Sequence, residues 1–525
     1  TSTGDARRNP DGTTRVRGLS APDRARNFFK TDIPFDSYNT DRVDIQRGAN
    51  SFLFGLGSPS GLTNTGMARA TFRNLNEIST RIGSGNSDTP TYRGSFKLNR
   101  VLVKDLLAVH VAGLADRTKY RQEPTYKNDT RQYGALTLRP FKHQDTVITA
   151  HVEVGRIRGN AADVLLPQEN LTTFLHDPVV GRKSFNAWAN LQQFNHVEGP
   201  TLAQWNRLSA ADKQRFTVRD TPTANSLFNG NWGNGAYGLV YDGTKGAQPA
   251  FAYTAQYRAA DYLQRDPFFA PNRNAKGAPY NVYHGNLSDI NGPGWFDQGF
   301  LDLETFDFSK ASMAWDNDFY TRDFSNYNVA VEQVFLKGRA GFELAFDYQD
   351  IVRRDYVSFN AGVSRVMLDV NETLWLPTNP NYTAGNVQPM PNPNYGRPFV
   401  ITKANDRIFD QQRKAGRFTG FLKYDAKEHI KRPWLAKLLG SHTLSGLLDQ
   451  STFQERFIPY TYNSFGDPEP ALHIGPANAR QASNAPRNVP LMSYIGPPQL
   501  DAFTNPNFTL SDFVISPATY QLRLP

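Results

Sequence analysis

One short segment combines basic and aromatic side chains in a pattern that suits ligand binding. Its residues are Arg24, Arg26, Asn27, Phe28, Phe29 and Lys30. Guanidinium and ammonium groups form charge-assisted hydrogen bonds with anions, and aromatic rings stack on other rings. The segment therefore suits an anionic, ring-bearing ligand, although a solvated basic loop has the same composition.

Catalytic and metal-binding motifs do not stand out in the sequence. It has no cysteine, which excludes disulfides, thiolate zinc sites and cysteine nucleophiles. Its nine histidines are scattered without zinc-ligand spacing, so no metal site is predicted. No Ser/His/Asp order or carboxylate pair rises above chance. We therefore expect neither an enzyme nor a cofactor, and we expect His110 and His151, on polar strand faces, to line an interior.

Charge and hydropathy argue against two classes of protein, nucleic-acid binders and helical membrane proteins. The 525 residues include 58 Lys and Arg and 49 Asp and Glu, a net charge of +9 that is spread without a basic block. A nucleic-acid partner is therefore not predicted. No run of about 18 apolar residues occurs, which excludes a helical membrane span but not strands that alternate apolar and polar residues.

Alternation with a period of two is the strongest pattern in the sequence, and it predicts strands. The clearest segments are residues 92–99, 107–116, 131–139, 146–157, 327–335, 342–349, 417–424 and 443–455. In residues 342–349, for example, Leu344 and Phe346 share one face of the expected strand and Asp347 lies on the other. We expect about nine antiparallel strands after residue 76.

The connections between these segments alternate between short and long. Turns near residues 104, 143 and 338 are short, whereas residues 159–325, 356–413 and 456–525 form long segments rich in Asn, Pro and Gly. An up-and-down barrel with short turns at one rim and long loops at the other produces this alternation. The water-soluble alternative, a β-sandwich or propeller, needs more uniform spacing.

The first 76 residues show only weak period-two alternation, and they predict a small α+β unit. The ordered features are Arg17-Gly18, the run Asp41-Arg42-Val43-Asp44-Ile45, Arg47-Gly48, Ser51, Leu53-Phe54-Gly55, Gly57 and Gly61. Such glycines suit a turn that passes close to other backbone or needs positive φ. A dinucleotide-binding loop is disfavoured, because the third glycine is one position late, Pro59 interrupts the motif and no helical pattern follows.

This ordered set resembles the plug domain of TonB-dependent outer-membrane receptors. Ser60 stands where the family usually has glycine, and residues 63–66 depart from its usual strand. The resemblance implies a mainly β fold: the C-terminal part of an α+β plug domain at residues 1–76, then an incomplete antiparallel transmembrane β-barrel at residues 77–525. Family barrels have 22 strands, so we expect a fragment that lacks half of the plug and the later strands.

The resemblance also implies a function in the outer membrane of Gram-negative bacteria. That function is TonB-dependent uptake of a scarce ligand, with a ferric siderophore as the first candidate and carbohydrate or cobalamin as the alternative. The partners would be TonB with ExbB and ExbD, the ligand and outer-membrane lipid. A secreted or surface β-rich glycan-binding protein remains the alternative from another class.

Two sets of site residues follow from the resemblance. Arg17 and Arg47 match plug arginines that pair with barrel glutamates, which would form a releasable lock because breaking a buried ion pair is costly. Two ordinary surface arginines are the simpler interpretation. Residues 24–30 match the plug loop that faces the ligand.

Overall fold

The computed structural model describes part of the chain. The described residues are 22–46, 61–84, 90–141, 145–160, 168–169, 171–176, 182, 237–241, 243, 251–254, 298–299, 302–357, 365–369, 373–374, 390–391, 393–402, 405–426, 431–460, 463–464, 488–489 and 491–517. Six predicted site residues, Arg17, Gly18, Arg47, Gly48, Gly55 and Gly57, lie outside them. Among the described residues, no helix is both long and apolar enough to cross a membrane.

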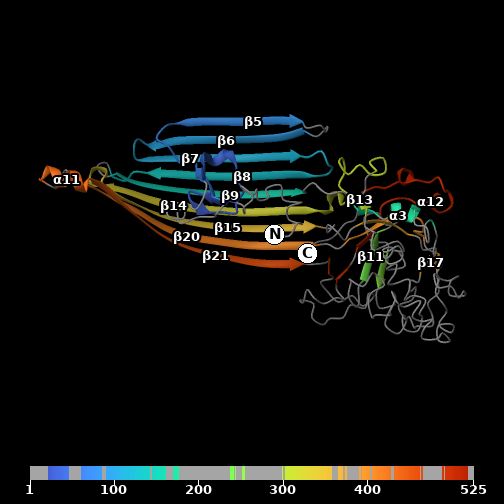
Figure 1. The fold of residues 1–525 in the computed structure, drawn as a ribbon. Helices are drawn as coiled ribbons and strands as arrows, with labels where there is room; N and C mark the ends of the chain where they lie inside the picture. Colours follow the sequence, from blue (N-terminus) through green and yellow to red (C-terminus); the bar gives the residue numbers. More distant parts are fainter. Residues whose placement is uncertain are drawn as a thin grey trace, which may run out of the picture.

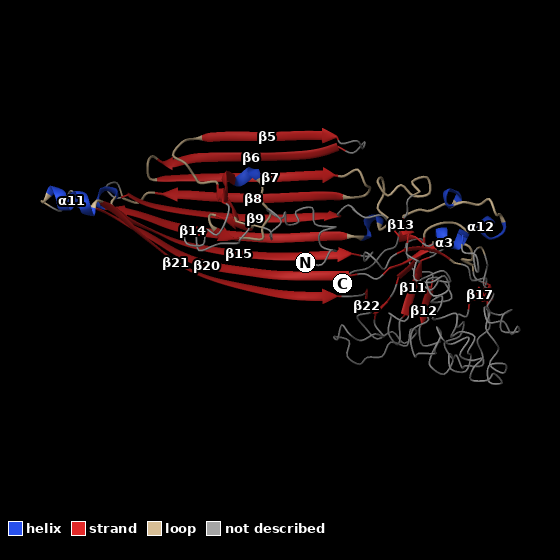
Figure 2. Ribbon diagram, in the orientation of Figure 1, coloured by secondary structure: helices blue, strands red, loops and turns tan. Residues whose placement is uncertain are grey.

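A nine-stranded antiparallel sheet dominates the fold (Figures 1 and 2). Its order is β21-β20-β15-β14-β9-β8-β7-β6-β5. The strands are β5 (Leu75–Ser84), β6 (Pro90–Val103), β7 (Leu107–Lys119), β8 (Tyr126–Leu138), β9 (Asp145–Asn160), β14 (Phe319–Phe335), β15 (Ala340–Val357), β20 (Asn405–Asp425) and β21 (Ser441–Tyr460). Each segment predicted from period-two alternation is thus a strand, and the prediction of a mainly β protein with a large antiparallel sheet is confirmed. β5 is a further strand, which the alternation did not single out.

Tight turns connect the strands at one end of this sheet. Between β14 and β15 the chain reverses over Leu336–Gly338, where Lys337 has a φ of +55° and Gly338 a φ of +87°. Glycine reaches this left-handed region without steric cost, so Gly338 permits the reversal. The register is regular across the whole hairpin, from Phe335 opposite Ala340 to Phe319 opposite Tyr356.

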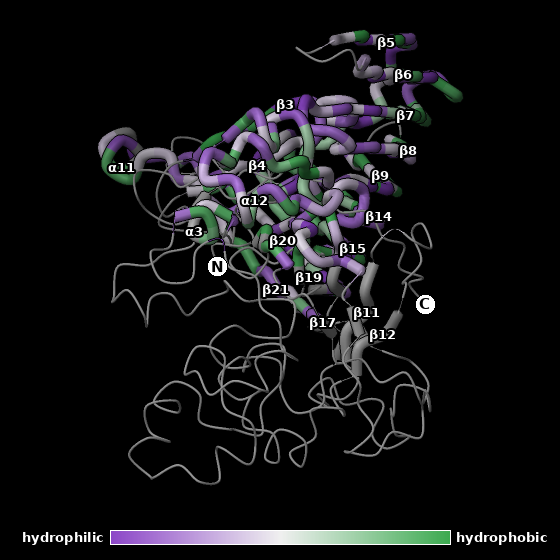
Figure 3. Tube along the Cα trace, turned by 90° about the vertical axis from the view of Figure 1, so that its right-hand side faces the viewer, coloured by the Kyte–Doolittle hydropathy of each residue, from purple (hydrophilic) through white to green (hydrophobic). Residues whose placement is uncertain are grey.

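A four-stranded sheet lies on one side of the large sheet. Its strands are β1 (Asp23–Arg26), β2 (Phe29–Lys30), β3 (Thr40–Gln46) and β4 (Leu62–Met67), in the order β2-β1-β4-β3. The end-on view in Figure 3 shows the large sheet as an arc with β3 and β4 on one side of it. Between residues 22 and 76, the described part contains strands and one 3-10 turn at Ser37–Asn39 but no α-helix, so the α+β plug is not confirmed.

The segments predicted as long loops carry structure of their own beyond the other end of the large sheet. They contribute a sheet ordered β12-β11-β24-β19-β16-β10-β13. Its strands are β10 (Gln168–Glu169), β11 (Tyr237–Tyr241), β12 (Phe251–Thr254), β13 (Gln298–Gly299), β16 (Arg365–Leu368), β19 (Pro398–Thr402) and β24 (Leu491–Tyr494). Helices α3 (Leu171–His176) and α12 (Asp501–Thr504) lie beside it (Figure 1). Phe174, Val400 and Phe513 share a buried apolar core, so segments far apart in sequence pack together here.

Two separate strand pairs and helix α11 (Pro433–Leu439) lie outside these three sheets. β17 (Thr373–Leu374) pairs with β18 (Met390–Pro391), and β22 (Asn463–Ser464) pairs with β23 (Asn488–Val489). Helix α11 joins β20 to β21 at the end of the large sheet that carries the tight turns (Figure 1).

Candidate functional site

The face of the large sheet that meets the four-stranded sheet carries polar rows beside small apolar clusters, such as Ile157, Phe324 and Ile351 around Ile33. One row across neighbouring strands reads Arg413, Gln349, Asn326, Glu153 and Tyr133. The next row, nearer the tight turns, includes Asp347, Asn328, His151 and His110. Because side chains alternate along each strand, every second residue of these strands points toward the small sheet. The predicted placement of His110 and His151 on an inward face agrees with these rows.

A buried ion-pair cluster joins the two sheets at the centre of this face. Glu153 on β9 is 0% exposed and pairs with Arg26 on β1, which is 1% exposed. The Tyr38 hydroxyl donates to the other oxygen of Glu153 at 2.8 Å. The Arg131 guanidinium on β8 lies 3.7 Å from Glu153 and donates two 2.8 Å hydrogen bonds to Asp129. The positive charges of the two arginines therefore balance the negative charges of Glu153 and Asp129, and all four side chains are buried.

A single backbone carbonyl connects the two arginines of the cluster. Pro34 O accepts from Arg26 Nη2 at 3.0 Å and from Arg131 Nη1 at 2.7 Å. Burying charges costs more than their attraction returns unless geometry and extra hydrogen bonds are good, and removal of one partner then leaves an uncompensated charge. The cluster is thus held in place by mutual compensation, and movement of the small sheet must break the bonds of Arg26 and Tyr38 to Glu153 and the bond of Arg131 to Pro34 O.

The tip of the β1–β2 hairpin forms a second contact with the large sheet. Asn27 and Phe28 have φ of +46° and +63°, a left-handed conformation that is unusual for a bulky residue such as Phe28. Asn64 on β4 accepts from the Phe28 N–H at 2.7 Å, and Arg417 on β20 donates to the carbonyls of Asn27 and Phe28 at 3.4 and 3.3 Å. The Arg417 guanidinium also lies 4.7 Å from the centre of the Phe29 ring.

Neutral hydrogen bonds make the third contact. Thr31 Oγ1 donates to Gln349 Oε1 at 2.7 Å, and Gln349 Nε2 donates to the carbonyl of Lys30 at 3.1 Å. Both Thr31 and Gln349 are buried. These bonds fix the position of the small sheet along β15.

Ion pairs surround the buried cluster. Arg93 on β6 donates to Asp36 at 2.6 and 3.1 Å, Arg413 pairs with Asp32 at 2.5 Å, and Arg69 pairs with Glu332 at 2.9 Å. Burial raises the pKa of Asp36, but the hydrogen bonds from Arg93 and from the Tyr38 N–H outweigh burial and hold it below its usual range. Burial, then the charge and hydrogen bond of Glu153, raises the pKa of Tyr38, so its hydroxyl remains a donor.

The structure separates the residues predicted to bind ligand. Arg26 and Phe29 are buried against the large sheet, and Asn27 caps the hairpin tip through a 3.0 Å hydrogen bond from the Met67 N–H. Arg24 is half-buried, with its guanidinium 4.9 Å from the centre of the Phe35 ring, and the side chain of Lys30 is 49% exposed and pairs with Asp23. A ligand role for this segment stays a prediction.

Six residues of the predicted plug motif are also described, namely Asp41–Ile45 and Gly61. Asp41 begins the exposed part of β3 and accepts from the Arg69 N–H at 3.1 Å, and Arg42 pairs with Asp44 at 3.2 Å. Gly61 has a φ of +96°, the conformation that its turn was expected to need. Its carbonyl accepts from the Asp23 N–H at 3.0 Å and so aligns β4 beside β1.

Sequence reasoning missed Glu153, Arg131, Asp129 and Tyr38. Glu153 and Arg131 do lie on the polar faces of predicted strands, where a charge among uncharged neighbours is a usable signal. The pairing of Glu153 with Arg26 could not be predicted from the sequence, because it depends on how a segment 127 positions away docks on the sheet.

The opposite face of the large sheet is apolar and exposed. One row across seven strands reads Leu448, Phe418, Leu344, Val331, Ile148, Leu138 and Leu107. Three rows nearer the predicted loops, the row on the same face reads Gln412, Asp350, Ser325, Val154 and Gln132 and is polar apart from Val154. We call the apolar rows of this face the apolar band; it ends where polar side chains begin.

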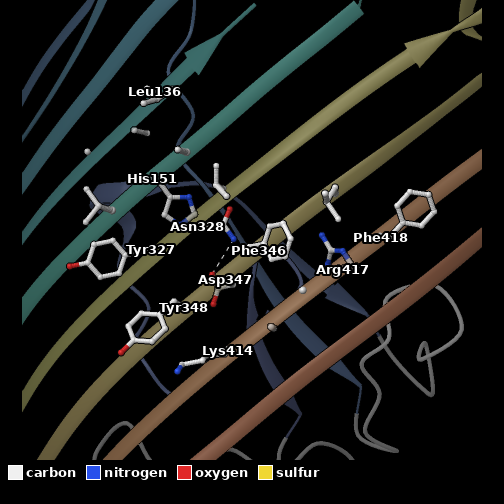
Figure 4. Close-up of a pocket in the computed structure, with 18 of the residues that line it drawn as sticks. Leu136, His151, Tyr327, Asn328, Phe346, Asp347, Tyr348, Lys414, Arg417 and Phe418 are labelled. Atoms are coloured by element: carbon white, nitrogen blue, oxygen red, sulfur yellow. Dashed lines mark hydrogen bonds between the residues drawn. The ribbon is translucent and has the colours of Figure 1, made fainter.

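A broad depression of about 1300 Å³ lies in the apolar band (Figure 4). Tyr327 and Tyr348, on neighbouring strands with ring centres 6.1 Å apart, lie at its border toward the polar rows. Behind them Asn328 donates to Asp347 at 3.1 Å, drawn as a dashed line in Figure 4. The depression is on the far side of the sheet from the ion-pair cluster, so we interpret it as curvature of the band.

Comparisons with known proteins match by structure only. No protein-family model and no curated protein matches the sequence. The ferripyoverdine receptor of the Pseudomonas aeruginosa outer membrane is similar with a TM-score of 0.42 and 11% identity, over 85% of this chain and 38% of that chain. The ferric-catecholate import receptor of E. coli K12 is similar with a TM-score of 0.35 and 9% identity, over 78% of this chain and 43% of that chain.

A siderophore receptor of Acinetobacter baumannii is similar with a TM-score of 0.33 and 10% identity, over 93% of this chain and 63% of that chain. The matches are to TonB-dependent siderophore receptors, and this chain spans between 38% and 63% of the three receptor chains named here. At this degree of similarity, we base function on the chain's own residues.

Proposed function

We propose that this chain is the plug-side portion of a TonB-dependent receptor that imports a scarce, large ligand across the bacterial outer membrane. In this proposal the nine-stranded sheet is part of the barrel wall and the four-stranded sheet is part of the plug. The partners are TonB with ExbB and ExbD, the ligand and outer-membrane lipid. A ferric siderophore is the first candidate for the ligand.

The observation that carries the proposal is the buried cluster of Arg26, Arg131, Glu153 and Asp129. A soluble sandwich packs its two sheets through apolar side chains. Here small apolar clusters, such as Ile33 with Ile157 and Phe324, also lie between the sheets, but the centre of the contact is the Arg26–Glu153 ion pair and the Tyr38–Glu153 hydrogen bond. Such a contact suits a plug that stays closed at rest and moves when force is applied, and it supports a lock role for Arg26 beside the one predicted for Arg17 and Arg47.

The exposed apolar band supports a wall embedded in lipid. Phe346 is 52% exposed, whereas its neighbour Asp347 is 6% exposed and faces the small sheet. Transmembrane barrels carry apolar side chains outside and polar side chains inside. Tyr327 and Tyr348 at the border of the band are typical of the aromatic girdle near a membrane interface.

Growth under iron limitation tests the proposal. We expect the intact receptor containing this chain to let Gram-negative cells without other siderophore receptors grow on a ferric siderophore, and only when TonB is present. Growth on a carbohydrate or cobalamin instead would shift the ligand to the alternative class. A purified chain that stays monomeric in water without detergent would overturn the receptor proposal in favour of a secreted glycan-binding protein.

A variant separates transport from folding. Glu153→Gln keeps size and removes the charge that Arg26 and Arg131 share, so we expect altered transport with a correctly inserted wall. Glu332→Gln, at an exposed pair with Arg69, serves as the control because exposed pairs contribute little. Equal transport in both variants would remove the lock from the proposal.

A further inference from the structure

Helix α11 sets the β20–β21 connection apart from the other turns at its end of the large sheet. β14 and β15 are joined through Leu336–Gly338, and β6 and β7 through residues 104–106. The connection from β20 to β21 instead runs through residues 426–440 and includes a helix (Figure 1). A strand reversal needs only a few residues, so this extra length calls for a reason.

The helix exposes large apolar side chains. Trp434 is 63% exposed, Leu438 is 74% exposed and Leu439 is 42% exposed. With 3.6 residues per turn, these side chains fall on one arc of the helix, and Lys437 lies outside that arc. Wide exposure of a tryptophan and two leucines on one short helix indicates a surface that is covered in the working protein.

The charged side chains of residues 431–442 are all positive, whereas Asp425 and Glu428 precede this stretch. Lys431, Arg432 and Lys437 are exposed, and residues 431–442 contain no Asp or Glu. The described part of the connection therefore presents basic side chains beside an apolar arc. This combination is typical of helices that lie in a membrane surface, where basic groups reach lipid phosphates.

Hydrogen bonds fix the helix relative to the strands. The Ala426 N–H donates to Gly440 O at 2.9 Å, and His442 Nε2 lies 2.5 Å from Leu439 O. Gly440, with a φ of +64°, ends the helix and returns the chain to β21. The exposed arc is thus held in one orientation at the rim.

The arc continues the apolar band. On the same outer face, Leu444 and Leu448 of β21 are 72% and 71% exposed, and Leu422 and Tyr424 of β20 are 48% and 41% exposed. These side chains lie between the centre of the band and α11. A lipid layer that covers the band therefore reaches the helix without a break.

We propose that α11 lies in the surface of an anionic phospholipid leaflet at the turn end of the sheet. The apolar arc is buried at the boundary of head groups and acyl chains, and Lys431, Arg432 and Lys437 contact lipid phosphates. The occupant is lipid because the arc is continuous with the apolar band and its border is basic. This inference rests on the proposed function, which places the band in a membrane.

Site-directed spin labels test the inference on the full chain in vesicles. Because the chain has no cysteine, single variants carry one label each. Leu438→Cys reports on the helix, Phe346→Cys on the apolar band, and Thr504→Cys on an exposed residue of α12 at the other end. In vesicles containing phosphatidylglycerol, we expect the label at residue 438 to be accessible to oxygen and shielded from a water-soluble nickel complex, as at residue 346 and unlike residue 504.

The charges are tested in the same assay. Replacement of phosphatidylglycerol by phosphatidylcholine, or the triple change Lys431→Gln, Arg432→Gln and Lys437→Gln, should lower the ratio of buried to water-exposed label by up to about fivefold per basic side chain. Unchanged accessibility in both cases would overturn the anionic-lipid proposal.

The remaining outcomes separate the two proposals. A label at residue 346 in lipid with a label at residue 438 in water overturns the role of α11 and leaves the proposed function intact. A label at residue 438 that neither oxygen nor nickel reaches, whatever the lipid, indicates a protein contact and also overturns it. Both labels in water would overturn the membrane-embedded wall, and with it the proposed function.

Discussion

The two faces of the nine-stranded sheet are built from the same strands and are packed against different surroundings. On β15, Asp347 and Gln349 are 6% and 1% exposed and bond to neighbouring strands and to the small sheet. Their neighbour Phe346 is 52% exposed. In a water-soluble sheet the apolar face is the buried one. The reversal teaches that paired polar groups, together with small apolar clusters, hold the inner face, and that the outer face is stable only against an apolar solvent.

The largest effect is expected where a charge is removed from the inner face. Glu153→Ala leaves Arg26 and Arg131 without their shared partner and should weaken docking of the small sheet by about 3–5 kcal/mol. The labelling rate of an introduced Ala68→Cys, a buried position between the sheets, measures docking as urea is added. If Glu153→Ala behaves like the exposed control Glu332→Ala, the inner face does not depend on the buried cluster.

A charge placed on the outer face should come next. Phe346→Arg puts a guanidinium in the apolar band and should cost about 2–4 kcal/mol of folding in lipid vesicles, whereas Gln132→Arg in the polar row should cost about 0–1 kcal/mol. Urea titration of vesicle-bound protein measures both. Equal costs would mean that the two rows face the same solvent, so that the outer face would have no apolar band distinct from its polar row.

The ion pair at the border of the inner face should have a smaller, pH-dependent effect. Because the pKa of Asp36 is lowered in the folded protein, its stabilisation is complete at pH values above the ordinary 3.8 and is lost as the pH falls through the lowered value. Asp36→Asn should cost about 1.5–3 kcal/mol at neutral pH. Urea midpoints of the parent and the variant, measured from pH 7 to pH 3, should converge only at the acidic end; a constant difference would exclude Asp36 ionisation as its cause.

The smallest effect is expected at the border of the apolar band. Tyr327→Leu keeps an apolar side chain and removes the ring that lies beside Tyr348, so the loss should be about 0.5–1.5 kcal/mol in vesicles. Val329→Leu, in the next apolar row, is the control and should change little. A larger loss in the control would show that the tyrosines have no special role at the border.

The strands could be predicted because their signal is local. Alternation in segments such as 342–349 and 146–157 depends only on neighbouring residues, and both segments lie within strands of the structure. β5 was missed because polar Thr80 lies between Ile78 and Ile82 on the same face of the strand and interrupts the period-two alternation. The loop segments contain packed structure that period-two alternation does not reveal, since the shared core of Phe174, Val400 and Phe513 joins distant parts of the chain.

The sequence by itself determined the strands, the two-sided character of each strand and a basic, aromatic segment near residue 26. The inward placement of the polar faces was expected only through the predicted barrel, because alternation by itself is symmetric with respect to inside and outside. Only the tertiary structure decided that Asp347 points inward and Phe346 outward, and that Arg26 meets Glu153 from a segment far away in the sequence. The physical reason is that burial and ion pairing depend on distances in space, which local patterns do not specify.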